Sequence, residues 1–138
     1  MSSAYLDTSA AMRLIVDEPQ SNALVQELVS REDRRLVASW LLHTELHCAA
    51  GRHPETVTIA AVQAVLDTLV LVDVTRGDLL AAGTHAPLRS NDAIHLAVAL
   101  RTGCDEIVTY DDALATAARS AGLAVVAPAG LSADRPSR

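Results

Sequence analysis

Four acidic side chains stand inside or at the end of apolar segments, where an ionised carboxylate is costly to bury. They are Asp7, Glu45, Asp92 and Asp111. A buried carboxylate is tolerated when a positive charge, hydrogen bonds or a metal ion compensates it. The chain has no lysine, so few side chains are available as cationic partners. Because hard divalent cations prefer oxygen ligands, the four acids predict a divalent-cation site.

Glu45 is the acid that is hardest to explain by a structural role alone. Its surroundings predict a helix over residues 39–51, with Ser39 as N-cap and Gly51 as C-cap, so Glu45 is too far from either end to act as a cap. The residues one turn away on either side are apolar, which places Glu45 on the apolar face of this helix. These neighbours are Leu41, Leu42, Cys48 and Ala49.

The other acids have simpler explanations when each is taken alone. Asp92 and Asp111 stand at the expected starts of helices, where a carboxylate commonly caps the backbone and opposes the helix dipole. Asp112 is adjacent to Asp111, so the residues alone leave open which of the two belongs to a site.

The elements that carry these acids alternate along the chain between short apolar strands and helices. Strands are expected at 4–6, 36–38, 70–74, 106–109 and 124–126, and helices at 9–16, 21–30, 39–51, 54–68, 77–85, 91–102 and 112–121. Continuous apolar strands alternating with helices predict an α/β protein, a three-layer α/β/α sandwich with a short, mostly parallel central sheet. Ligands of such sheets bind beyond the carboxyl ends of the strands, which is where Asp7 and Asp111 fall.

Length and charge narrow the function classes. The 138 residues are enough for one domain, expected over 1–130, with a polar, flexible C-terminal tail over 131–138. A net charge of −6 argues against nucleic-acid binding through a broad basic surface, but it is compatible with a nuclease whose metal supplies the local charge. No targeting signal or membrane-length apolar segment is evident, so we expect a cytoplasmic protein that does not bind membranes.

Several short motifs together resemble the PIN-domain ribonucleases, and most closely the VapC-type toxins of type II toxin–antitoxin systems. The motifs are Asp-Thr-Ser from Asp7, Thr-Glu ending at Glu45, Asn-Asp-Ala-Ile-His-Leu-Ala from Asn91, and Val-Thr-Tyr-Asp ending at Asp111. The resemblance spans residues 4–128 and favours Asp111 over Asp112.

The resemblance implies a metal-dependent endoribonuclease. All four acids would be catalytic and would bind Mg²⁺ or Mn²⁺, with Asp7 and Asp92 as the firmest ligands and Ser9 and Thr109 as supporting hydroxyls. A metal-activated water would hydrolyse an RNA phosphodiester bond. The partners implied are an RNA substrate, a cognate antitoxin protein and a second copy in a homodimer.

Alternative functions remain open at this level. A catalytically silent PIN-like binding module, or a housekeeping PIN nuclease without an antitoxin, would share these motifs. A phosphatase of the haloacid dehalogenase type would need an acid where Ser9 stands, and a response-regulator receiver would need a lysine.

Other polar residues carry weaker indications. Arg13, Arg89 and Arg101 are candidate phosphate contacts, although exposed arginines are more often solvated or paired. His95 lies one turn after Asp92 and could approach the acids, but packing within an apolar helix is the simpler interpretation.

Overall fold

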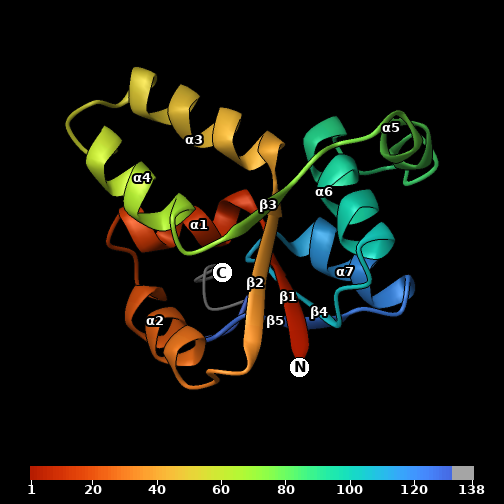
Figure 1. The fold of residues 1–138 in the computed structure, drawn as a ribbon, viewed down its shortest axis with the longest axis horizontal. Coiled ribbons are helices and arrows are strands. Elements are labelled where there is room, and N and C mark those ends of the chain that lie inside the picture. The colour runs from red at the N-terminus through yellow and green to blue at the C-terminus, as the bar shows by residue number, and fades with distance from the viewer. Residues whose placement is uncertain (132–138) are drawn as a thin grey trace, which may run out of the picture.

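The computed structural model describes residues 1–131, and its centre is a five-stranded, entirely parallel sheet (Figure 1). The strand order is β3-β2-β1-β4-β5. The strands are β1 (Ser2–Leu6), β2 (Arg34–Ser39), β3 (Val70–Val72), β4 (Glu106–Val108) and β5 (Ala124–Val126). Apart from Leu131, the expected C-terminal tail lies outside the described residues.

Helices cover both faces of the sheet, which confirms the three-layer α/β/α prediction (Figure 1). One layer contains α1 (Thr8–Ile15), α2 (Ser21–Val29), α3 (Trp40–Arg52) and α4 (Ile59–Leu66). The opposite layer contains α5 (Arg76–Ala82), α6 (Ser90–Arg101) and α7 (Asp112–Ser120). No helix within residues 1–131 is long and apolar enough to cross a membrane.

Successive side chains of the central strand β1 point to opposite faces of the sheet, which explains how both faces are buried. Ala4 and Leu6 of β1 pack into one apolar cluster together with residues of α1, α3 and α4. Tyr5 points to the opposite face and joins a second cluster with Leu96 of α6 and Leu114 of α7. Successive side chains of a strand face opposite sides, so an apolar strand of this kind serves two cores at once.

The start of α4 and the end of α3 differ from the sequence-based expectations, whereas the start of α3 agrees with them. Pro54 does not begin a helix: α4 starts at Ile59, because the Thr58 hydroxyl caps it by accepting a hydrogen bond from the Ala61 amide at 3.1 Å. Gly51 lies inside α3, which continues to Arg52. The Ser39 cap is confirmed, since its hydroxyl accepts a hydrogen bond from the Leu41 amide at 3.2 Å.

The direction of the strands determines where polar side chains converge. All five strands run parallel, so their carboxyl ends share one edge of the sheet. At that edge β1 passes directly into Asp7 and α1, β2 into α3, and β4 into Thr109. The first residues of α1, α3 and α7 are therefore brought close to one another by the topology.

Candidate active site at the carboxyl edge of the sheet

Asp7 is the most deeply buried of the four acids, with only 2% of its surface exposed. Its Oδ1 accepts hydrogen bonds from the Ser9 hydroxyl at 2.8 Å and from the Ala10 amide at 3.0 Å, the latter capping α1. Its Oδ2 accepts a hydrogen bond from the Thr109 hydroxyl at 2.6 Å. Burial nevertheless raises the pKa of Asp7 above its ordinary value, because these donors only partly compensate for the loss of water.

Asp92 lies in the first turn of α6 and is half-buried. Within residues 1–131 its carboxylate accepts no hydrogen bond, and the helix cap is Arg89, so Asp92 is not the cap that its position suggested. Burial, and after it the charges of Asp111 and Asp7, raise the pKa of Asp92. This carboxylate is therefore held beside two others, with no hydrogen-bond donor in the part of the chain that the structure describes.

Asp111 caps a helix, as its place in the sequence suggested, and it also lies beside other acids of the candidate site. Its Oδ1 accepts a hydrogen bond from the Leu114 amide at 2.8 Å and caps α7. Its Oδ2 is 3.9 Å from a guanidinium nitrogen of Arg89. Asp112 is exposed in the first turn of α7, whereas Asp111 is near enough to Asp92 to raise its pKa.

Glu45 differs from the three aspartates because its carboxylate is well compensated. Its Oε1 accepts hydrogen bonds from the Thr8 hydroxyl and from Nε2 of His95, the latter at 2.7 Å. Its Oε2 accepts one from the Asn91 amide at 3.1 Å. Burial alone would raise the pKa of Glu45, but these partners, His95 above all, hold it below its ordinary value.

Thr109 and Ser9 connect the acids through their hydroxyls. The Thr109 oxygen donates to Asp7 and accepts the Asp111 amide at 3.1 Å, so one buried hydroxyl bridges the residues after β1 and β4. The Ser9 oxygen, besides donating to Asp7, accepts the Tyr110 amide at 2.8 Å. Both predicted supporting hydroxyls thus contact Asp7.

His95 is the functional-site residue that sequence reasoning underrated. It is fully buried, as the packing interpretation required, yet both ring nitrogens are hydrogen-bonded: Nε2 to Glu45 and Nδ1 to the Tyr5 hydroxyl at 2.6 Å. The signal in the sequence that could have identified it is its place one turn after Asp92. The other helical histidines, His43 and His47, stack on each other at 4.2 Å on α3.

The three arginines considered as phosphate contacts differ in their position relative to the acids. Arg89 lies at the rim of the site with 87% of its side chain exposed. Arg13 donates to the Ser9 carbonyl at 3.0 Å and stacks over the Tyr110 ring. Arg101 is instead paired with Asp78 at 2.7 Å, so it is not positioned for the acidic site.

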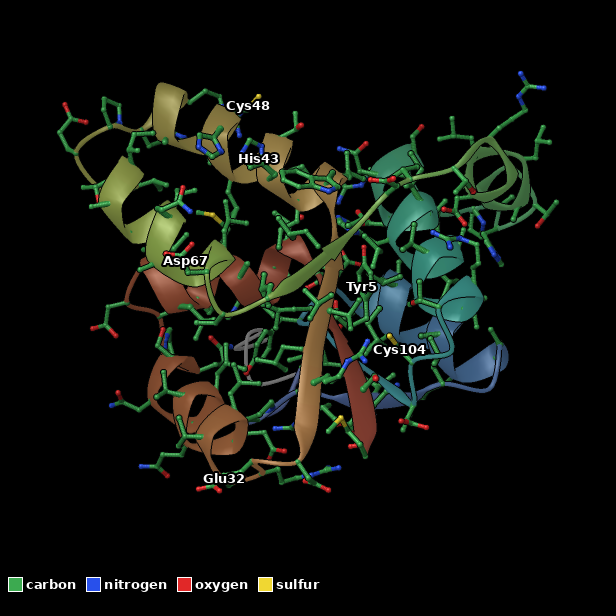
Figure 2. All side chains as sticks on the ribbon, in the orientation of Figure 1. Tyr5, Glu32, His43, Cys48, Asp67 and Cys104 are labelled. Carbon is green, nitrogen blue, oxygen red and sulfur yellow. The ribbon has the colours of Figure 1, made fainter. Side chains whose placement is uncertain are left out.

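Two surface hollows meet at Glu45 and Asn91. One, of about 360 Å³, is lined by Glu45, Arg89, Ser90, Asn91 and Asp92. The other, of about 630 Å³, follows one face of α3 from Leu41 past Glu45 to Arg52 and His53. Figure 2 shows Cys48, which also lines this second hollow, with its thiol directed outward from α3.

The donor set fits a hard cation that keeps part of its water. Within residues 1–131, no three His, Cys, Asp or Glu side chains are arranged closely enough to enclose an ion by themselves. Mg²⁺ is usually bound by one or two carboxylates and several waters, so a complete protein cage is not required. Asp92, to which none of the described residues donates, and Asp7, whose burial is only partly compensated, are the carboxylates that such a cation would stabilise most.

A protein-family model and curated relatives both match nearly the whole chain. Residues 4–120 match the PIN domain model. The chain is 42% identical over 132 residues to Ribonuclease VapC46 of Mycobacterium tuberculosis, covering 93% of this chain and 99% of the relative. It is 41% identical over 130 residues to Ribonuclease VapC35 of the same organism, covering 90% and 96%.

Solved structures share the fold at lower identity. Mycobacterium tuberculosis VapC20, a sarcin-ricin loop cleaving toxin, aligns with a TM-score of 0.70 at 19% identity, over 91% of this chain and 99% of that one. DNA-bound VapBC from Salmonella typhimurium aligns with a TM-score of 0.71 at 17% identity, over 91% and 98%. From the PIN-domain match and the identity to curated relatives, the chain belongs to the VapC family of PIN-domain proteins.

Proposed function

We propose that this protein is a Mg²⁺- or Mn²⁺-dependent endoribonuclease that acts as the toxin of a toxin–antitoxin pair. One observation carries the proposal: Asp7, Asp92 and Asp111 lie together at the carboxyl edge of the sheet, and the first two have pKa values raised by burial. Evolution tolerates such destabilising carboxylates mainly at functional sites. The curated relatives named as ribonucleases support RNA as the substrate.

Each side chain then has a part in phosphodiester hydrolysis. Asp7 and Asp92 would hold the cation, and Glu45 and Asp111 would contact it directly or through water. A bound cation of this kind lowers the pKa of a coordinated water and neutralises charge that develops on the phosphoryl oxygens. In the reaction a water oxygen forms a bond to phosphorus, the bond from phosphorus to the 3′ oxygen breaks, and the 3′ oxygen takes a proton.

The remaining residues of the site orient the acids and the RNA strand. Ser9, Thr109 and the Ala10 amide fix the Asp7 carboxylate. Arg89, exposed at the rim beside Asp111, would pair with a phosphate of the RNA. The hollow along α3 offers space for a strand that continues beyond the acids, ending at Arg52.

Regulation by an antitoxin protein is the second part of the proposal. Several solved structures that share this fold are toxin–antitoxin complexes, including one from Klebsiella pneumoniae. On α2, Leu24 is fully buried in the core, whereas Val25 is 46% exposed and offers apolar surface for such a contact. We also propose that the toxin forms a homodimer, which light scattering of the purified protein measures directly.

The test is RNA cleavage by the purified protein with Mg²⁺, with Mn²⁺ and with excess chelator. We expect cleavage only with a metal, leaving 5′-phosphate and 3′-hydroxyl ends, and loss of cleavage in Asp7→Asn, where asparagine preserves the α1 cap. Asp67→Asn is the matched control, since Asp67 is an exposed acid at the C-cap of α4, outside the acidic site (Figure 2). Undiminished cleavage in chelator, or in Asp7→Asn, would refute the mechanism.

A further inference from the structure

A buried chain of hydrogen bonds stands behind Glu45, on the side away from solvent. It runs from the Ser39 hydroxyl to the Tyr5 hydroxyl at 3.2 Å, from Tyr5 to His95 Nδ1 at 2.6 Å, and from His95 Nε2 to Glu45 at 2.7 Å. Ser39, Tyr5 and His95 are all fully buried. Figure 2 shows Tyr5 beside the central strands, and its ring meets His95 edge-on at 5.6 Å between centroids.

The chemistry of the groups determines where the proton of the imidazole lies. An ionised carboxylate only accepts hydrogen bonds, so the short contact to Glu45 requires a hydrogen on Nε2 of His95. At Nδ1 the direction depends on the single hydrogen of the Tyr5 hydroxyl: either Nδ1 accepts that hydrogen, or Nδ1 donates to the Tyr5 oxygen while the Tyr5 hydroxyl donates to Ser39. Burial raises the pKa of Tyr5 far above its ordinary value, so the phenol keeps its hydrogen in both cases.

This arrangement connects parts of the molecule that are far apart in the sequence. Tyr5 belongs to β1, Ser39 ends β2, His95 lies on α6 and Glu45 on α3. Thr8, at the start of α1, contacts both Glu45 and His95 Nε2, the latter at 3.2 Å. The Glu45 side chain is thereby fixed by protein contacts, in contrast to Asp92, which has no donor among residues 1–131.

We infer that His95 is a positioning residue of the active site, oriented by Tyr5, whose role is to hold the Glu45 carboxylate toward the acidic cluster. Its importance for cleavage rests on the proposed nuclease function. A partner that orients a metal-binding carboxylate typically affects metal affinity or activity by about 10- to 100-fold when it is removed.

Substitutions of His95 separate this role from simple packing. His95→Leu fills a similar space without a donor, and we expect Mn²⁺ affinity and RNA cleavage each to fall by about 10- to 100-fold. His95→Gln restores a side-chain N–H toward Glu45, so it should recover most of both. Tyr5→Phe removes one hydroxyl and should lower cleavage by about 2- to 10-fold, the range for a single neutral hydrogen bond.

A matched control accounts for any loss of stability. Val98→Ala truncates another fully buried residue of α6 and should lower the melting temperature without altering Mn²⁺ affinity or cleavage. Equal Mn²⁺ affinity and cleavage in wild type and His95→Leu would overturn the inference, and so would failure of His95→Gln to exceed His95→Leu.

Nitrogen-15 NMR of the imidazole gives a readout that is independent of catalysis. In the metal-free wild type we expect a hydrogen on Nε2, and a change in its signal in Glu45→Gln. A ring without hydrogen on Nε2 would overturn the inference even if the protein cleaves RNA. If the wild type does not cleave RNA, the proposed function fails, while this measurement still decides whether His95 holds Glu45.

Discussion

Replacing Thr109 by valine removes the hydroxyl that joins Asp7 to Asp111 while keeping nearly the same shape. The hydroxyl donates to Asp7 at 2.6 Å and accepts the Asp111 amide at 3.1 Å, and Thr109 is fully buried, so water cannot replace it. A hydrogen bond to a charged group contributes about 1.5–3 kcal/mol to the free energy of unfolding. For a domain of this size, that loss lowers the melting temperature by about 5–12 °C.

Cleavage should fall as well, because Asp7 loses one of its side-chain donors. We expect a decrease of about 10- to 100-fold for Thr109→Val, the range found when a partner of a metal ligand is removed. Thr109→Ser is the matched control: it keeps the hydroxyl and loses one buried methyl group, at a cost of about 1 kcal/mol.

The assay compares melting temperature and initial cleavage rate for the two variants in Mg²⁺. The serine variant should be less stable than the wild type yet cleave at a similar rate, whereas the valine variant should lose both properties. Wild-type cleavage by Thr109→Val would show that this hydroxyl does not position Asp7, and the account of the supporting residues would be wrong.

Three further predictions concern titration, the choice between neighbouring acids, and stability away from the site. Because the pKa of Asp92 is raised in the folded protein, its ionised form destabilises the fold when no metal is bound. In chelator, Asp92→Asn should therefore melt at a higher temperature than the wild type, and this difference should grow as the pH rises through the raised pKa. A difference that does not change with pH would contradict this. Asp111→Asn, in which asparagine still caps α7, should reduce cleavage at least tenfold, roughly the effect of losing a metal contact, while Asp112→Asn should not; the reverse result would reassign the fourth acid. Arg34→Met should lower the free energy of unfolding by about 1.5–3 kcal/mol, because the buried Arg34 donates to the carboxylates of Glu27 at 3.0 Å and Glu106 at 2.8 Å. It should leave Mn²⁺ affinity unchanged; denaturant unfolding and calorimetry measure the two quantities.

The fold class was predictable because the strands are short apolar segments separated by amphipathic helices. The last strand, 124–126, agrees with β5 residue for residue. The helix expected from Pro54 was wrong because proline only permits a helix start, whereas the Thr58 hydroxyl supplies an actual cap. Apolar character determined which segments are buried, but local hydrogen bonds determined where each helix begins.

The acids were recognisable from the sequence because a carboxylate in an apolar segment stands out. Their environments were not, since these depend on residues distant in the chain. Taken alone, Asp92 could have been explained as a cap of α6, but the cap position belongs to Arg89, three residues earlier. The charges of Asp111 and Asp7 instead raise the pKa of Asp92.

The hydrogen-bond partners of His95 likewise could not be predicted from the sequence. A histidine in an apolar helix is usually a packed residue, and this one is fully buried. Its partners come from β1 and α3, so only the tertiary structure shows that its two nitrogens join Tyr5 to Glu45.

The central claim is that carboxylates left uncompensated by the protein hold the cation on which RNA hydrolysis depends. The most direct test measures Mn²⁺ binding by calorimetry and RNA cleavage on the same samples of wild type and Asp92→Asn. The account predicts that Asp92→Asn loses both while its metal-free form melts at a higher temperature than the wild type at neutral pH, because a destabilising charge is gone. Mn²⁺ affinity and cleavage equal to those of the wild type in Asp92→Asn would contradict it.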